Sequence, residues 1–290
     1  MDMPRRTEMD FPRWIITALA IAAFALIAVF FIFLLWQSLP IFKAEGWNFL
    51  TGRDWWAGET YGALPMIFGS LMVTGLALAW VLPLALAGAI VTSEYLSPKW
   101  RLAVKSSMEL FAGIPGIVYG LLGVTVLAVW VKDIFGLIDG NTILTASLLL
   151  GVMVLPTIMT LAEDALHAVP GRYREASTGL GLTKLQTTVS VALPQARKGI
   201  FGAIFLGLGR AMGETIAVML VIGGLDRIPS PWYDIFSPGQ SIPAKLGREA
   251  AEALGGDLHW SALMALSLIL FLMVTGITTL GQLFLKRAQA

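Results

Sequence analysis

Long apolar stretches alternate with short polar ones along this chain of 290 residues. Six of the apolar stretches are roughly 20 to 26 residues long, enough for a helix to cross about 30 Å of hydrocarbon. They cover residues 15–36, 66–91, 110–131, 142–162, 200–224 and 261–285. The pattern predicts an all-α, polytopic membrane protein with six transmembrane helices.

The composition also favours a membrane protein. Hydrophobic residues make up 57% of the chain and charged residues 13%, whereas about 25% of the residues in a soluble domain are charged. The first apolar stretch follows three arginines, as a signal peptide would. It is too long for a signal core and has no small-residue cleavage site, so we expect a retained helix. With no cysteine and two histidines, the chain cannot form disulfides, thiolate metal sites or a histidine-rich metal centre.

The basic residues predict the orientation, because Lys and Arg are retained on the cytoplasmic side during insertion. With both termini cytoplasmic, the cytoplasmic side holds Arg5, Arg6, Arg13, Lys99, Arg101, Lys105, Arg172, Arg174, Lys184, Arg197, Lys198, Lys286 and Arg287. The opposite side holds only Lys43, Arg53, Lys132, Arg227, Lys245 and Arg248. Two long outer loops, 37–65 and 225–260, are either solvated connectors or a docking or gating surface for an external partner.

The inner loop 163–199 is the most strongly patterned polar segment. Pro170 can begin a short helix, which glycines then interrupt, and a second helix begins at Thr183, where Gln186 completes a capping box. Pro194 is expected to end this second helix. One face of the second helix is apolar and consists of Leu182, Leu185 and Val189. By itself this pattern is typical of an amphipathic element that lies on lipid headgroups.

The same loop carries EASTGLGLTKLQTTVSVALP at residues 175–194. Its spacing resembles the EAA signature of permease subunits of ATP-binding-cassette importers, in which this loop docks on a separate ATPase subunit. The resemblance assigns ATPase coupling to Glu175, Ala176, Gly181, Leu193 and Pro194. The chain has no phosphate-binding loop of the form GxxxxGK[ST]. We therefore expect no cofactor in this chain, with ATP and Mg used by the partner ATPase.

Arg210 and Glu214 are unusual because they lie inside the apolar stretch 200–224. Four residues apart on one helix, they share a face and can pair. Charges in hydrocarbon are unfavourable, so both should face the protein interior or an aqueous path. They either form an ion pair that only packs helices together, or they serve an anion path. In the second case the guanidinium of Arg210 binds an oxyanion. Glu214 then accepts a hydrogen bond from hydrogen phosphate that sulfate cannot donate.

The chain looks like the C-type permease of bacterial phosphate-specific importers in YGALPMIFGSL (61–71), ELFAGIPGIVYGLLG (109–123), ILTASLLLGVMVLPTI (143–158) and GLGRAMGETIAVMLVIGG (207–224). This resemblance covers about residues 60–285 and implies the core of a type I (MetI-like) importer permease. It assigns substrate translocation to Arg210, Glu214 and Thr215. The implied partners are an A-type permease, two ATP-binding-cassette subunits and an extracytoplasmic phosphate-binding protein. Where the family commonly has serine, this chain has Gly116.

These observations predict an inner-membrane permease that imports phosphate and is not itself an enzyme. Residues 1–64 would hold a cytoplasmic tail, the first helix and an outer loop. Residues 65–285 would form the transport domain, with five helices and the coupling loop, and residues 286–290 a cytoplasmic tail. A sulfate or molybdate permease would leave Glu214 without a role, and an ion-coupled transporter would need no ATPase-docking loop. A membrane enzyme is disfavoured, because we find no nucleophile–base pair and no metal-ligand cluster.

Overall fold

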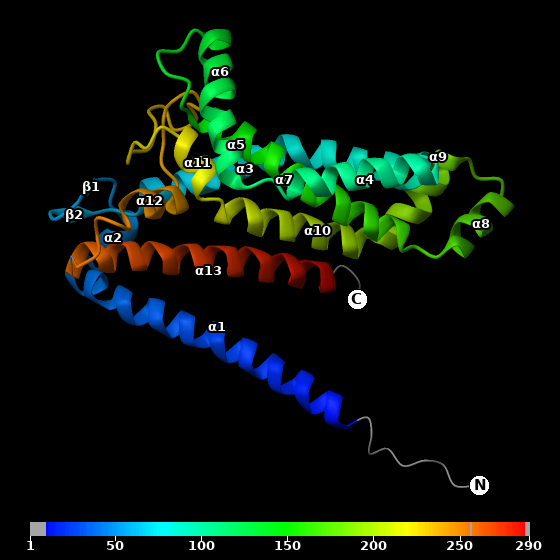
Figure 1. Cartoon of the computed structure of the whole chain (residues 1–290), viewed down its shortest axis with the longest axis horizontal. Helices are drawn as coiled ribbons and strands as arrows, with labels where there is room; N and C mark the ends of the chain where they lie inside the picture. The colour runs from blue at the N-terminus through cyan, green and yellow to red at the C-terminus, as the bar shows by residue number, and fades with distance from the viewer. Residues whose placement is uncertain (1–9, 256, 288–290) are drawn as a thin grey trace.

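The computed structural model describes residues 10–255 and 257–287, and within them the chain is almost entirely helical. Its long helices run in the same general direction (Figure 1). They are α1 (Asp10–Glu45), α3 (Leu64–Ile90), α7 (Ile143–His167), α10 (Leu193–Gly213) and α13 (Asp257–Arg287). An antiparallel hairpin, β1 (Trp55–Trp56) and β2 (Thr60–Tyr61), is the small departure from the expected all-α fold.

Shorter helical segments connect the long ones. They are α2 (Asn48–Thr51), η1 (Val91–Tyr95), α4 (Pro98–Ala112), α5 (Gly116–Leu122), η2 (Gly123–Leu127), α6 (Ala128–Phe135), α8 (Gly171–Gly179), α9 (Lys184–Thr187), η3 (Thr188–Ala192), α11 (Ile216–Val221) and α12 (Ile242–Glu249). The segments named η are π-helical turns. We call the end of the bundle with α8 and α9 the α8–α9 end, and the opposite end, with α12 and the hairpin, the α12 end (Figure 1).

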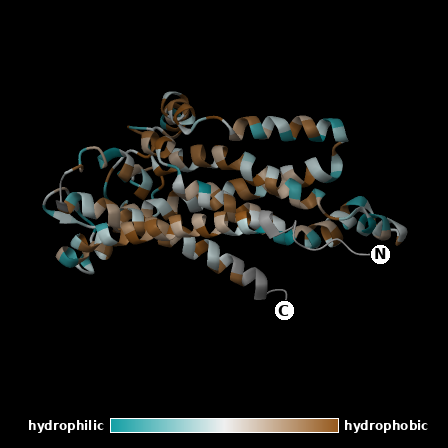
Figure 2. Ribbon diagram, turned by 60° about the horizontal axis from the view of Figure 1, so that its bottom comes forward, coloured by the Kyte–Doolittle hydropathy of each residue, from teal (hydrophilic) through white to brown (hydrophobic). Residues whose placement is uncertain are grey.

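Several helices are long and apolar enough to cross a membrane. Among the described residues these are Arg13–Glu45, Leu64–Tyr95, Gly116–Phe135, Ile143–His167 and Leu258–Gly281. Hydrophobic residues dominate the long helices, and hydrophilic residues gather toward the loops at both ends (Figure 2). Most of α1 is exposed, as expected of a helix whose apolar side chains face lipid. The first apolar stretch thus forms one helix, which packs on α13 with the rings of Phe31 and Phe271 5.6 Å apart.

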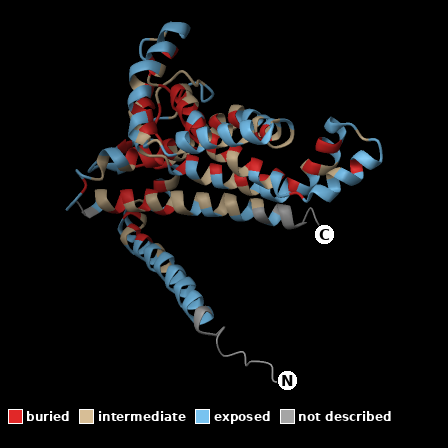
Figure 3. Cartoon of the chain, turned by 45° about the vertical axis from the view of Figure 1, so that its right-hand side comes forward, coloured by how far each residue is buried: buried red, intermediate tan, exposed pale blue. Residues whose placement is uncertain are grey.

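The core lies between α3, α7 and α10, where buried residues concentrate (Figure 3). Small side chains on α3, such as Ala77 and Ala85, are at most 1% exposed and let α7 approach closely. Gly207 of α10 faces Ile158 of α7 with no room for a Cβ atom between them. This packing holds the C-terminal half of α10 against α7.

Two of the six expected spans are broken, so the expectation of one continuous helix in each is wrong. In the stretch 200–224, α10 ends at Gly213 and α11 begins at Ile216, with Glu214 extended between them. In the stretch 110–131, α4 ends at Ala112 and α5 begins after Pro115. Proline disfavours helical backbone in the residue before it, which explains the second break. The stretch 200–224 is therefore an interrupted span made of α10 and α11, beside the five candidates that are long and apolar enough to cross a membrane.

The loop 163–199 folds as two short helices, α8 and α9, as predicted. The capping box is confirmed, since Thr183 N donates to Gln186 Oε1 at 2.8 Å and Gln186 N to Thr183 Oγ1 at 3.3 Å. Pro194 does not end the second helix, which is a correction. Instead α9 continues through the π-helical turn η3 into α10, with Pro194 in its first turn. A wider turn just before Pro194 accommodates the hydrogen bond that proline cannot donate.

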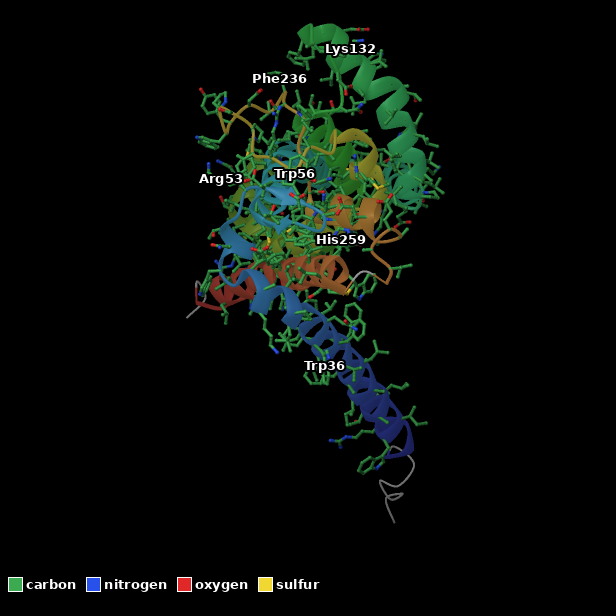
Figure 4. The ribbon with its side chains drawn as sticks, turned by 90° about the vertical axis from the view of Figure 1, so that its left-hand side faces the viewer. Trp36, Arg53, Trp56, Lys132, Phe236 and His259 are labelled. Atoms are coloured by element: carbon green, nitrogen blue, oxygen red, sulfur yellow. The ribbon has the colours of Figure 1, made fainter. Side chains whose placement is uncertain are left out.

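A buried ionic cluster joins the hairpin, α12 and the start of α13. These elements lie at the α12 end, which faces the viewer in Figure 4. Lys245 of α12 is 2% exposed, and its Nζ lies 2.5 Å from both Asp226 Oδ2 and Glu249 Oε1. Trp55 Nε1 of the hairpin donates to Glu249 Oε2 at 3.2 Å, and His259 of α13 lies 3.5 Å from the same oxygen. The two long connecting segments are therefore folded onto each other and onto the start of α13.

Candidate functional site

The two helix breaks lie against each other. Gly120 of α5 lets α11 approach, because a Cβ atom there would lie 2.7 Å from Leu220 Cδ1 and 3.0 Å from Ala217 Cα. Gly116, the first residue of α5, faces Glu214, and a Cβ atom there would lie 2.8 Å from the carboxylate Oε1. The ends of α4, α5, α10 and α11 thus meet in one region. Interrupted helices of this kind form substrate sites in membrane transporters, because their ends offer unpaired backbone groups.

Arg210 joins three helices at this meeting point. From the last turn of α10, its Nη1 donates to Thr157 Oγ1 of α7 at 2.9 Å. Its Nη2 donates to the backbone oxygen of Ala112, the last residue of α4, at 3.0 Å. The final carbonyls of a helix lack partners within the helix and carry partial negative charge, which suits a cation. Tyr119 acts similarly, since its hydroxyl donates to Phe111 O at 2.9 Å.

Glu214 occupies the break rather than a helix face. Its Oε1 accepts a hydrogen bond from Ala217 N at 3.2 Å, so the carboxylate caps the start of α11. In the part of the chain that the structure describes, no ion pair joins Arg210 and Glu214, so the alternative of an ion pair that only packs helices together is not supported. The four-residue rule assumes an unbroken helix, and α10 ends at Gly213 between the two side chains.

Thr215 lies beside Glu214 and is half-buried. Its Oγ1 donates to Gly213 O at 3.2 Å, which stabilises the extended link between α10 and α11. A cavity of about 10 Å³ borders the Glu214 side chain, the size that holds about one water molecule. Its polar lining consists of Ser70 and Thr74 of α3 and Ser241 before α12. Arg210, Glu214 and Thr215 therefore lie in one region of the fold, each with different hydrogen-bond partners.

The arrangement offers the chemistry of an oxyanion site. Both acceptors that Arg210 uses, a hydroxyl and a backbone carbonyl, are neutral. Hydrogen bonds from a guanidinium to an ionised oxygen are stronger, and its planar donors can bind two oxygens together. An incoming oxyanion can therefore replace the neutral acceptors, while Glu214 Oε2 has no hydrogen-bond partner among the described residues and lies at the same break.

A second charged cluster, which the sequence did not reveal, positions α4. Glu163 of α7 is 1% exposed, and its Oε1 accepts from Arg101 Nε at 2.6 Å. Lys105 lies 3.5 Å from Glu163 Oε2 and also pairs with Asp164. Arg101 and Lys105 are four apart on α4, a spacing that places both on one face. This cluster fixes the first half of α4 on α7, and Arg210 holds its other end.

The residues expected to couple to an ATPase lie together at the α8–α9 end. Glu175 and Ala176 are exposed on α8, while Leu193 is half-buried and Pro194 exposed at the start of α10. Gly181 has φ of +81° in the turn between α8 and α9, a conformation that glycine adopts without steric penalty. The apolar face expected around α9 is present, with Leu185 and Val189 exposed and Leu182 half-buried.

Comparison with known proteins agrees with this architecture. Residues 84–289 match the family described as binding-protein-dependent transport system inner membrane component. The chain is 35% identical over 275 residues to the phosphate transport system permease protein PstC of Mesorhizobium japonicum, covering 88% of this chain and 82% of that protein. It is 36% identical over 291 residues to PstC of Pasteurella multocida, covering 93% and 89%.

Among solved structures, the chain is similar to a chain in the crystal structure of a bacterial alginate ABC transporter in complex with an alginate pentasaccharide-bound periplasmic protein. The TM-score is 0.65, the sequence identity is 16%, and the match covers 98% of both chains. At this identity the likeness concerns the fold alone.

Proposed function

Because this chain belongs to the family of binding-protein-dependent transport system inner membrane components, we propose that it is the permease subunit of an ATP-driven phosphate importer. Its similarity over most of its length to two phosphate permeases named PstC supports phosphate as the substrate. The observation that carries the proposal is the position of Arg210, a cation held by two neutral acceptors where two broken helices meet. The chain moves its substrate and does not transform it.

Arg210 is proposed to bind phosphate by exchanging partners. Phosphate oxygens replace Thr157 Oγ1 and Ala112 O on the guanidinium, since charged acceptors bind it more strongly. The end of α4 then loses its cation, so arrival of the anion loosens the α4 end of the site. Glu214 accepts a hydrogen bond from the P–OH group of hydrogen phosphate, and Thr215 keeps the link between α10 and α11 extended. This assignment distinguishes phosphate from sulfate, which has no proton to donate.

The energy is proposed to come from partner subunits. ATP and Mg are bound by two ATP-binding-cassette subunits that dock on Glu175, Ala176, Gly181, Leu193 and Pro194. A second, A-type permease completes the transport path, and an extracytoplasmic phosphate-binding protein delivers the substrate at the α12 end. With both termini cytoplasmic and the α8–α9 end inside, the chain lies in the cytoplasmic membrane.

ATP-dependent uptake of radiolabelled phosphate into vesicles that carry the chain with its co-expressed partners tests this proposal. We expect uptake to resist excess sulfate and to fall at least 100-fold in Arg210→Ala, whereas Arg227→Ala, which removes an exposed arginine, keeps it. Inhibition by sulfate would instead support a permease for another oxyanion. Uptake that persists after deletion of the ATPase would support an ion-coupled transporter.

Glu214 has its own test in the same vesicles. Glu214→Gln keeps an oxygen that can accept from Ala217 N but removes the negative charge that repels sulfate. We expect the variant to transport phosphate and to be inhibited by sulfate. If it retained the selectivity of the wild type, Glu214 would not be the discriminator.

A further inference from the structure

Arg174 of α8 binds two other elements at once. Its Nε and Nη2 donate to the two carboxylate oxygens of Glu94, at 3.1 and 2.5 Å. Its Nη1 donates to Val169 O at 2.7 Å and its Nη2 to Leu166 O at 2.9 Å, at the end of α7. The Glu94 side chain is 6% exposed. This bidentate contact requires the planar guanidinium. It fixes both the orientation of α8 and its distance from η1 and from the end of α7.

The two short helices of the loop are tied to each other by a buried hydrogen bond and form one unit. Ser177 Oγ of α8 and Thr187 Oγ1 of α9 lie 2.9 Å apart, and both residues are buried. The turn η1 contacts both helices, since Glu94 binds α8 and the ring of Tyr95 lies 5.0 Å from Lys184 Nζ of α9. The turn η1 directly continues α3.

A displacement of the unit formed by α8 and α9 would be transmitted to α10 and to α3 by different routes. It reaches α10 through the chain itself, since α9 and η3 run into α10 without a break and α10 ends at Gly213. It reaches α3 through side chains of η1, among which Glu94 makes a bidentate ion pair. Farther along α3, Ser70 and Thr74 line the cavity beside Glu214. The helix α3, which has Pro83 inside it and continues into η1, therefore connects the Arg174–Glu94 pair with the wall of that cavity.

We propose that the Arg174–Glu94 ion pair transmits movement of the α8–α9 loop to α3, and so couples the partner ATPase to the wall of the Glu214 cavity. The inference rests on the proposed function, because it requires an ATPase docked on this loop. Glu175 and Ala176, the next residues of α8, are exposed and free to meet that partner, while Arg174 is directed to the bundle. Arg174 and Glu94 are thus positioning residues, not contacts of phosphate or ATP.

The test compares Glu94→Gln with Arg172→Gln in the complete transporter. Arg172 is a matched control, because it is an exposed arginine on the same helix whose guanidinium lies over the Tyr173 ring. We expect Glu94→Gln to keep assembly and at least half of the ATP hydrolysis, while phosphate moved per ATP falls about tenfold. Glu94→Asp, which keeps the charge, should restore part of the ratio. Equal ratios in all variants, or a parallel loss of hydrolysis and uptake, would overturn the proposal.

A second measurement separates this inference from the choice of substrate. The chain has no cysteine, so Leu84→Cys of α3 and Leu272→Cys of α13, both exposed, can carry a unique pair of spin labels. Trapping ATP in the partner should change the distance between the labels in the otherwise wild-type chain and not with Glu94→Gln. The same change in both, or none in either, overturns the proposal. If the labels respond as expected but phosphate is not taken up, the coupling stands and the phosphate assignment fails.

Discussion

Arg210, which is exposed on this chain, and Glu214, which is half-buried, both bind backbone groups at helix ends within apolar segments. Arg210 donates to the last carbonyl of α4, and Glu214 accepts from an amide in the first turn of α11. Helix ends supply such groups because their carbonyls and amides lack partners within the helix. In hydrocarbon these groups must be satisfied by the protein itself. Each break therefore provides a partner for one charged residue, and the site needs both breaks.

Gly116 sets the position of the Glu214 carboxylate. In Gly116→Ala the new Cβ atom would lie 2.8 Å from Oε1, so the carboxylate must move away from Ala217 N. Losing that hydrogen bond destabilises this position of the carboxylate by about 1 kcal/mol. We expect about a fivefold loss of phosphate uptake and weaker discrimination against sulfate in the vesicle assay.

Gly113→Ala is the matched control for this substitution. Gly113 belongs to the same break, but its nearest contacts for a Cβ atom are 3.4 and 3.6 Å away and its φ is −83°, which alanine adopts without strain. Equal uptake and selectivity in the two variants would show that the absence of a side chain at Gly116 does not set the position of the Glu214 carboxylate.

At the scale of elements, the capping box at Thr183 holds the start of the long helical run from α9 to Gly213. In Thr183→Ala the amide of Gln186 loses its side-chain acceptor, which costs about 1 kcal/mol for a helix N-cap. Amide hydrogen exchange, followed by mass spectrometry on the purified transporter, should therefore speed up about fivefold over residues 184–192. Thr178→Ala should leave this segment unchanged, because the Thr178 hydroxyl donates only within α8. Unchanged exchange in Thr183→Ala would contradict a capping role.

The sequence predicted these elements unevenly, for physical reasons. Apolar length and capping chemistry are local, so the spans and the Thr183 cap were predictable. The break at Gly213 was not, because the apolar run continues through it and the contacts that hold the break, such as the packing of α11 on α5, are tertiary. The expectation that Arg210 and Glu214 share one helix face was wrong for the same reason. The sequence showed Arg174 only as one of the basic residues of the loop. Its pairing with Glu94 could not be predicted, because Glu94 lies 80 residues away in the chain.

At the scale of the whole molecule, Lys245 ties together segments that are far apart in the sequence. Lys245→Met leaves Asp226 and Glu249 without their cation, and breaking a buried pair by removing one partner costs roughly 3 kcal/mol. Both carboxylates are about a quarter exposed, so water screens part of this loss. We expect the apparent unfolding temperature of the purified transporter to fall by more than about 5 °C.

Arg227→Met is the control, because Arg227 is an exposed neighbour of Asp226, and it should change the unfolding temperature little. Equal unfolding temperatures for the two variants would rule out a stabilising role for Lys245.

The distribution of charge predicts which way the whole bundle faces. The α8–α9 end carries Arg172, Arg174, Lys184, Arg197 and Lys198, and basic residues are retained on the cytoplasmic side. Because the chain has no cysteine, a single introduced cysteine reports one position. Ser97→Cys is exposed before α4, near the α8–α9 end, and Ala57→Cys is exposed between β1 and β2 at the α12 end. On intact cells, a membrane-impermeant maleimide should label Ala57→Cys, and Ser97→Cys only after permeabilisation. The reverse pattern would place the loop that carries the EAA signature outside, where no ATPase that uses cytoplasmic ATP could reach it, and would remove the basis for an ATP-driven importer.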